Sequence, residues 1–250
     1  MDINSLTQSV QFKIEHFKVV TSTNTLAKHR LQQGEVLEGL VLLADEQTEG
    51  RGQLNSVWES NAGENIMCSV VLMPTFLPVT NQTYLNMAIC LAVFDTINKF
   101  VPNQVSIKWP NDIYINQKKV AGLLIENSIQ GTTIKYSIVG MGINVNQEKF
   151  NVDTATSLSN QTNTNYILID VVNDLLSNIN NRYGQLKLKQ WQPIFNEYHK
   201  HLLGLNKLLT FKTQTEQFEG TILGVNTNGQ LQIKRGNEVL NFGVKQISMI

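Results

Sequence analysis

The sequence predicts an α+β fold, in which a mixed or antiparallel sheet with flanking helices precedes a small β module. Up to about residue 203, strand-like apolar segments alternate with segments whose apolar residues recur at helical spacing. After Gly204 only short strand-like segments remain, and a strong turn sequence, Asn226-Thr-Asn-Gly229, separates two of them. We therefore expect two domains, residues 1–203 and residues 204–250.

Composition excludes several classes of protein. The chain has 250 residues, is 42% hydrophobic, and carries 20 basic and 20 acidic residues. Its zero net charge argues against a broad nucleic-acid-binding surface. No apolar run approaches the ~18 residues of a membrane span, and the N-terminus does not read as a signal peptide. Cys68 and Cys90 lie in apolar segments, which indicates buried thiols in a reducing, cytoplasmic compartment.

The elements follow in order. A helix is expected over 23–31, where Ser22 or Thr23 can cap it and Gly34 can end it. Strands are expected over 39–45 and 65–73, and a long, mostly buried helix over 81–100. Three further strands follow, at 105–109, 119–129 and 133–145, then a polar loop at 153–165. Helices near 167–183 and 190–202 lead to short strands at 208–213, 218–225, 230–235 and 239–244.

Two polar segments flank the first predicted strand. Thr21-Ser22-Thr23-Asn24 reads either as a helix cap or as a cluster of small hydrogen-bonding groups around a polar ligand. Gly50-Arg51-Gly52 lies in a loop between two strands and reads either as a plain surface loop or as a segment that grips an anion. It lacks the third glycine of a dinucleotide fingerprint, and no helix follows it. Trp58 beyond it reads as a core aromatic or as a cover for a flat base.

The segment 106–113, SIKWPNDI, interrupts an apolar strand with polar residues and a proline, which the interior of a sheet tolerates poorly. We favour a functional reason. Lys108 can meet phosphate, Asn111 can form hydrogen bonds, and Asp112 can hold a divalent cation. The four scattered His residues and two Cys residues lack zinc spacing, so no structural metal site is predicted.

A third region combines a lysine with small residues. Lys119 opens a strand in which Ala121 and Gly122 leave room for a ligand against the backbone, although exposed lysine is common in hairpin turns. The stretch 140–144, GMGIN, forms a similar low patch on the next strand.

Together these motifs resemble the biotin protein ligases. TSTN, EQTEGRGQ with a following tryptophan, KWPND, KKVAG and GMGIN occur in that order between about residues 17 and 146. The resemblance implies a class II synthetase-like catalytic core, at 1–203, and a small SH3-like β-barrel at 204–250. It also implies a two-step reaction, in which biotin and ATP form biotinyl-5′-adenylate and pyrophosphate. A lysine of a biotin carboxyl carrier protein domain then takes the biotinyl group.

The resemblance also implies roles for individual residues. Lys119, Arg51 and Asp112 are the implied catalytic residues, and Mg²⁺ is expected on the phosphates, with its protein ligands left open. The implied biotin site is Ser22, Thr23, Asn24, Gln47, Gly50, Arg51, Gly52, Gln53, Lys119 and Gly122. The implied ATP site is Arg51, Trp58, Lys108, Asn111, Asp112, Lys119 and Asn144.

The chain departs from the family pattern in its loop. Gln53 stands where many members carry arginine, and Ser56 where another basic residue is common. Arg51 and Lys119 therefore carry more of the electrostatic work, and we expect the loop to close over the adenylate as a lid. TSTN begins at residue 21. We therefore expect a short form, without the DNA-binding domain of some members, that binds neither nucleic acid nor membrane and possibly forms a homodimer.

Two alternatives stay open from the sequence. A lipoate or octanoate protein ligase or transferase shares the general fold and the chemistry of the acceptor lysine. A non-catalytic biotin-binding protein is compatible with the weakened loop, although the retained Lys119, Arg51 and Asp112 argue against it.

Overall fold

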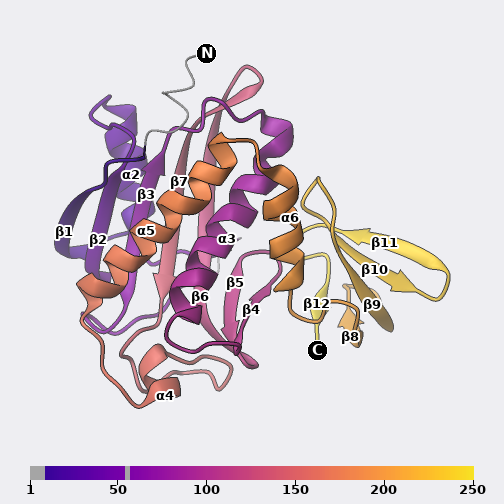
Figure 1. Cartoon of the computed structure of the whole chain (residues 1–250). Coiled ribbons are helices and arrows are strands. Elements are labelled where there is room, and N and C mark those ends of the chain that lie inside the picture. The colour runs from indigo at the N-terminus through magenta and orange to yellow at the C-terminus, as the bar shows by residue number, and fades with distance from the viewer. Residues whose placement is uncertain (1–8, 54–56) are drawn as a thin grey trace.

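The computed structural model describes residues 9–53 and 57–250 and contains two sheets (Figure 1). The main sheet has seven strands in the order β1-β2-β3-β7-β6-β5-β4. Their bounds are β1 Lys13–Val20, β2 Leu40–Gln47, β3 Ile66–Leu72, β4 Val105–Lys108, β5 Asp112–Ile115, β6 Lys118–Gln130 and β7 Thr133–Ile143. Only the β1–β2 pair is parallel among these described strands, and the others pair antiparallel. The expected mixed sheet is therefore confirmed.

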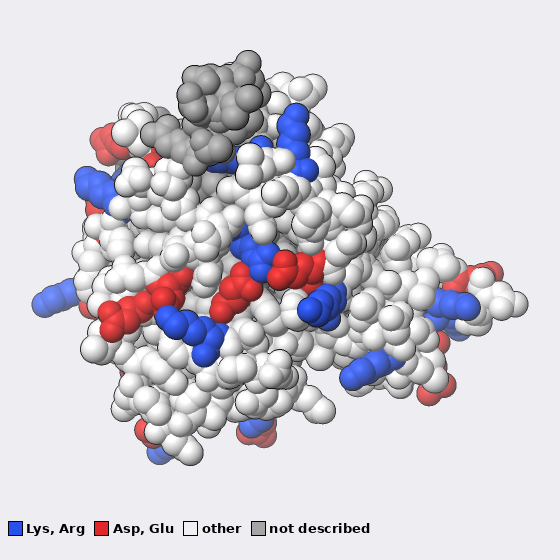
Figure 2. All heavy atoms as spheres, viewed as in Figure 1, with Lys and Arg blue, Asp and Glu red and all other residues white. Residues whose placement is uncertain are grey.

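Three helices cover one face of the main sheet (Figure 1). They are α3 Gln82–Asn98, α5 Leu168–Lys187 and α6 Trp191–Lys200, and a short 3₁₀ turn, η2 Val79–Asn81, precedes the first. Buried residues occur all around α3, as expected of a helix enclosed by the sheet and by other helices. The outer surface of this face carries acidic and basic side chains intermixed, without a patch of one sign (Figure 2).

Helix α2, Thr23–Gln32, packs on the opposite face. Side chains alternate between the two faces along each strand. Val41 of β2 and Val70 of β3 join the core beneath α3, whereas their neighbours Leu42 and Val71 pack with Ala27 of α2. The sheet is thus buried on both sides at this edge. On the face that carries α2, the helix does not cover the part of the sheet formed by β6 and β5.

The second sheet, which we call the C-terminal sheet, is antiparallel with the order β11-β10-β9-β8-β12. Its strands are β8 Leu208–Lys212, β9 Gln217–Val225, β10 Leu231–Arg235, β11 Glu238–Phe242 and β12 Ser248–Met249. It confirms the predicted run of short strands.

Direct hydrogen bonds fix the C-terminal sheet to the rest of the molecule. The indole N–H of Trp109 donates to the Gly229 carbonyl at 3.0 Å. His199 of α6 accepts from the Val225 N–H through Nε2, at 2.8 Å, while its Nδ1 lies 2.7 Å from the Phe195 carbonyl. These bonds define how the C-terminal sheet lies against the main sheet.

Three sequence expectations were wrong in detail. Residues 13–20 were not assigned, yet they form β1 at the edge of the sheet. Pro110 does not interrupt a strand, because it lies in the turn between β4 and β5, after a cis peptide bond. The polar stretch 153–165 contains a short helix, α4 Leu158–Thr162, which the Ser157 side chain caps. Pairing with β2 makes residues 13–20 a strand, pairing of β4 with β5 places Pro110 in a turn, and the Ser157 cap begins the helix α4.

An ion cluster holds the three helices of the covered face together. Arg182 of α5 is only 8% exposed. Its guanidinium donates to Asp95 of α3 at 2.7 and 3.0 Å and to Glu197 of α6 at 2.6 and 2.8 Å. Hydrogen bonding by Arg182 holds the pKa of the Glu197 carboxyl below its usual value.

Among the described residues, no helix combines the length and the apolar character needed to cross a membrane.

We predict that Arg182→Met lowers the free energy of unfolding by about 2–3 kcal/mol, because two carboxylates then lose their shared cation. Chemical denaturation at pH 7 measures this change. Arg235→Met is the matched control, since Arg235 and Glu216 are about half-exposed and their ion pair is worth about 0–1 kcal/mol. Equal losses in the two variants would contradict the assignment of Arg182 as the main helix clamp.

The same cluster predicts a dependence on acid. The folded-state pKa of Glu197 lies below its unfolded value, so its contribution is complete above that unfolded value, at about pH 4.5. It is lost as the pH falls through the folded pKa. The stability difference between the wild type and Glu197→Gln should therefore shrink when denaturation is repeated at decreasing pH below 4.5. A difference that stays constant with pH would show that the charge of Glu197 contributes nothing.

Candidate functional site

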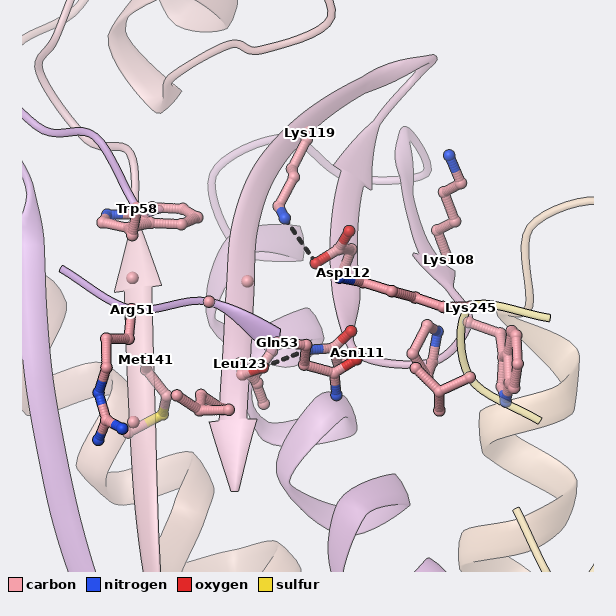
Figure 3. A pocket seen from close by; sticks show the side chains of 18 of the residues that line it. Arg51, Gln53, Trp58, Lys108, Asn111, Asp112, Lys119, Leu123, Met141 and Lys245 are labelled. Atoms are coloured by element: carbon pink, nitrogen blue, oxygen red, sulfur yellow. Dashed lines mark hydrogen bonds and ion pairs between the residues drawn. The ribbon is translucent and has the colours of Figure 1, made fainter. Parts of the chain in front are cut away.

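A cavity of about 310 Å³ lies on the face of the main sheet that carries α2, and it extends to the C-terminal sheet (Figure 3). Its floor is the centre of β6 and β7, where Gly122, Gly140 and Gly142 replace larger residues. Side chains from α2, the loop after β2, and the β4–β5 turn form its walls. The cavity is therefore the place where the motifs of the sequence meet.

Polar side chains at the start of α2 form one end of the cavity. Ser22, Thr23 and Asn24 are 3–4% exposed. The backbone N–H and the hydroxyl of Thr23 both donate to Oε1 of Gln47, at 2.8 and 3.1 Å. The hydroxyl of Ser69 lies 2.7 Å from Oγ1 of Thr23 and 2.6 Å from Oδ1 of Asn24. These bonds fix the orientation of Thr23, Asn24 and Gln47, whereas Ser22 precedes α2 without the side-chain capping bond expected from the sequence.

Glu126 of β6 connects this polar end to the loop after β2. Its Oε2 accepts from Nδ2 of Asn24 at 2.7 Å and from the guanidinium of Arg51 at 3.3 Å. Asn24 also donates to the Leu124 carbonyl at 3.2 Å, so the protein uses both donor hydrogens of this amide. The side chain of Asn24 is therefore held in one orientation by its hydrogen bonds to Leu124 and Glu126.

The middle of the cavity depends on close approach to the sheet backbone. A Cβ on Gly140 would overlap the amide of Asn24, and one on Gly142 would overlap the indole of Trp58. A Cβ on Gly122 would lie 3.1 Å from both Trp58 and Lys119. The Trp58 ring thus covers the glycine floor, and Nζ of Lys119 lies 5.6 Å from its centre.

Charged groups gather at the other end. Nζ of Lys119 forms an ion pair with Asp112 at 2.7 Å. The Asn111 amide donates to the Leu123 carbonyl and is thereby held against β6. Lys108 donates to the hydroxyl of Tyr114 at 3.2 Å, and Figure 3 shows its side chain directed away from Asp112.

The loop after β2 begins and ends on paired backbone. The Trp58 N–H donates to the Gly50 carbonyl at 3.0 Å, and Arg51 pairs with Val57 in an antiparallel bridge. A Cβ on Gly50 would lie 2.5 Å from the Trp58 carbonyl, so glycine is required at this position. Ser56, the second predicted departure from the family loop, lies outside the described residues.

The cavity brings together most of the predicted residues. It is lined by Ser22, Thr23, Asn24, Gln47, Arg51, Gly52, Gln53, Trp58, Lys108, Asn111, Asp112, Lys119 and Gly122. Gly50 and Asn144 do not line it. Gly50 closes the base of the loop, and Asn144 is a buried residue whose amide donates to the Thr156 carbonyl at 2.9 Å.

Sequence reasoning missed several residues of the site. Ser69 is a polar residue inside an otherwise apolar strand, and that pattern was a usable signal. Glu126 follows the apolar residues of β6, and this position was a weaker signal of a functional residue. The side chains that the C-terminal sheet contributes gave none, because their place in the cavity depends on packing between the two sheets.

Three buried polar atoms and one thiol remain to be described. Within residues 9–53 and 57–250, Nε1 of Trp58, Oγ of Ser106 and Oδ1 of Asn144 are buried without a hydrogen-bond partner in the protein. Such groups are costly unless a ligand or water meets them. Burial raises the pKa of Cys68, which borders the cavity, to about 12, so its thiol stays protonated and is a poor nucleophile at neutral pH.

Comparison with known proteins agrees with this geometry. The model of the biotin/lipoate A/B protein ligase family matches residues 16–144. The bifunctional ligase/repressor BirA of Bacillus subtilis is 32% identical over 234 residues, which cover 92% of this chain and 70% of that protein. The biotin--[acetyl-CoA-carboxylase] ligase of Mycobacterium tuberculosis is 35% identical over 141 residues, 55% of this chain and 51% of that protein.

A solved structure shows the same architecture. The biotin protein ligase from Aquifex aeolicus in complex with biotin and ATP has a TM-score of 0.79 and 27% identity, covering 95% of this chain and 98% of its own. The family model spans more than half of this chain, and the Bacillus relative matches nearly all of it. The chain belongs to the biotin/lipoate A/B protein ligase family.

Proposed function

We propose that this chain is a biotin protein ligase. It joins biotin and ATP into biotinyl-5′-adenylate with release of pyrophosphate, and then transfers the biotinyl group to a lysine of a biotin carboxyl carrier protein domain. The observation that carries this proposal is the order of groups along one cavity. A polar end, a glycine floor and a cationic end follow one another, and they match the ring, the aliphatic tail and the carboxylate of biotin.

The polar end favours biotin over lipoate. The ureido group of biotin has two N–H donors and a carbonyl acceptor, whereas the dithiolane ring of lipoate has no strong hydrogen-bonding group. Ser22 and Thr23 are almost fully buried, and Gln47 is held in place by two hydrogen bonds. A site built around polar groups rejects a ligand that leaves them unpaired.

The charged end suits the first step. The carboxylate of biotin attacks the α-phosphorus of ATP, the new C–O–P bond forms, and pyrophosphate leaves with the electrons of the broken P–O bond. Two anions must meet for this to occur. The Lys119 ammonium offsets their repulsion, and Trp58 excludes water from the tail and the reacting carboxylate.

Asp112 fits a metal-assisted reaction. A carboxylate in a site for anions opposes binding unless a cation lies between them, and Mg²⁺ is commonly held by one carboxylate together with substrate phosphates. No cluster of three acidic, His or Cys ligands occurs among the described residues, which is compatible with a cation carried mainly by the nucleotide. Bound Mg²⁺ would neutralise charge on the leaving pyrophosphate, with Asp112 as its protein ligand.

The proposed acceptor is a carboxylase carrier domain. The Mycobacterium tuberculosis relative is named for acetyl-CoA carboxylase, which supports this choice. We place the reaction in the cytoplasm, where ATP and carboxylases occur. Homodimer formation and the lack of nucleic-acid or membrane binding stay predictions, as does closure of the loop at residues 48–57.

The direct test is pyrophosphate release from the purified chain with ATP, Mg²⁺ and biotin, compared with the same mixture containing lipoate. Release that requires biotin, followed by labelling of a carrier-domain lysine, is the expected result. Release with lipoate alone would support the alternative within the family. Biotin binding without any pyrophosphate would indicate a non-catalytic binding protein.

We predict that Lys119→Ala lowers the rate of adenylate formation roughly 10²-fold or more. The substitution removes a preorganised cation from the point where carboxylate and phosphate meet, which is worth about 3 kcal/mol of barrier. Pyrophosphate release under saturating substrates measures the loss. Lys118→Ala is the matched control, because Lys118 is the exposed neighbour on the same strand and does not line the cavity. Wild-type turnover by a folded Lys119→Ala protein would refute this role.

We predict that Gln53→Arg slows release of biotinyl-5′-adenylate about fivefold. Gln53 lines the cavity, and a charged hydrogen bond to phosphate exceeds a neutral one by roughly 1 kcal/mol. Release of labelled adenylate without a carrier domain is the measurement. Gln53→Met keeps the length without polarity and should release faster than the wild type. An unchanged or faster rate in Gln53→Arg would mean that residue 53 does not face the phosphate, or that Arg51 and Lys119 already saturate it.

A further inference from the structure

The side chain of Asn24 lies across three strands at the polar end of the cavity. Gly140 of β7 is paired with Ser69 of β3 on one side and with Leu124 of β6 on the other, so the three residues form one row across the sheet. The Asn24 amide rests on this row, because a Cβ on Gly140 would come within 2.3 Å of its Oδ1. Oδ1 faces Ser69 at 2.6 Å, and Nδ2 faces the Leu124 carbonyl at 3.2 Å.

Glu126 supplies the strongest partner of this amide. The two ends of an asparagine amide have nearly the same shape, so its hydrogen-bond partners decide which end points where. Oε2 of Glu126 accepts from Nδ2 of Asn24 at 2.7 Å. A carboxylate acceptor at this distance outweighs the neutral Leu124 carbonyl at 3.2 Å. The hydroxyl of Ser69 has no preference, because it can donate to Oδ1 or accept from Nδ2.

The orientation of the amide reaches Thr23 through Ser69. Ser69 has one hydroxyl hydrogen and two acceptors within reach, Oδ1 of Asn24 at 2.6 Å and Oγ1 of Thr23 at 2.7 Å. The hydroxyl hydrogen of Thr23 is directed at Oε1 of Gln47. While Asn24 competes for the Ser69 hydrogen, Oγ1 of Thr23 keeps capacity to accept from a ligand. If the amide turned over, Nδ2 would donate to Ser69, and the Ser69 hydrogen would go to Thr23 alone.

Glu126 lies behind the cavity wall. Among the described residues, the lining includes Thr23 and Asn24 but neither Glu126 nor Ser69. Ser69 is fully buried, so it has no route to a ligand except through its neighbours. A contribution of Glu126 to ligand binding therefore passes through the side chains that it holds.

We propose that Glu126 is a positioning residue that sets the affinity for the ureido ring of biotin. By holding the Asn24 amide, it keeps Oγ1 of Thr23 available as an acceptor for a ureido N–H. A buried N–H that finds no acceptor weakens binding, so the state of this one oxygen matters. The inference rests on the proposed ligase function and adds a residue to it that touches neither biotin nor ATP.

Binding of biotin alone, measured by calorimetry, is the direct test. Glu126→Ala removes the acceptor of Asn24 and should weaken biotin binding about tenfold, the effect of one hydrogen bond. Glu126→Gln should stay within about threefold of the wild type, because its amide oxygen can take the place of Oε2. The affinity for ATP without biotin should change less than about twofold in both variants, since the Lys119–Asp112 pair lies at the other end of the cavity.

A double-mutant cycle tests the path from Glu126 to Thr23. Ser69→Ala removes the hydroxyl that links Asn24 to Thr23. In that background, Glu126→Ala should weaken biotin binding by less than about twofold more, whereas independent effects would multiply. A general loss of packing would lower the affinities for biotin and ATP together and would not depend on Ser69.

Contrary outcomes are distinct. Unchanged biotin affinity in Glu126→Ala, or losses that multiply in the double variant, would overturn the role of Glu126. A Glu126→Gln protein as weak as Glu126→Ala would assign the effect to the charge that faces Arg51, and would overturn it too. A wild type that binds biotin but releases no pyrophosphate would refute the ligase function, and the role of Glu126 would still be judged from biotin binding. A wild type that does not bind biotin would refute both.

Discussion

The close approach of side chains to the backbone of β6 and β7 is the constraint on which the site depends. At Gly140 and Gly142 a single added carbon would overlap Asn24 or Trp58. These two strands lie near the middle of the main sheet, and each pairs with a neighbouring strand on both sides. A ligand tail laid along this floor would contact main chain below and an aromatic ring beside it. The rest of the site can then act at its two ends.

The rigidity of that floor comes from the opposite face. Helices α3, α5 and α6 cover it, and the Arg182 ion cluster fixes each helix to the others. Successive side chains along a strand point to opposite faces of the sheet. The residues next to those that pack beneath α3 therefore point toward the face that carries the cavity. One face of the sheet thereby provides stability and the other provides chemistry. This division lets polar and charged groups accumulate on the open face without disturbing the core.

The network around Glu126 links the polar end of the site to the loop after β2. The same carboxylate oxygen accepts from Asn24, at the polar end, and from Arg51, at the start of the loop. In Figure 3 the Arg51 side chain is turned away from Lys119 and Asp112. The Arg51–Glu126 ion pair is partly exposed to solvent and is therefore weak.

The sequence by itself determined the fold class, most helices and strands, and the residues of five motifs, because burial patterns and turn residues are local properties of the chain. It did not determine β1, whose strand character depends on parallel pairing with β2, or the turn that places Pro110 between β4 and β5. Only the tertiary structure laid Trp58 over the glycine floor and joined Glu126 to Arg51. It also placed Lys245 in the lining of a cavity whose floor is formed by strands much earlier in the sequence. Periodicity reports which side of an element is buried, but which groups meet across a cavity depends on how distant elements pack.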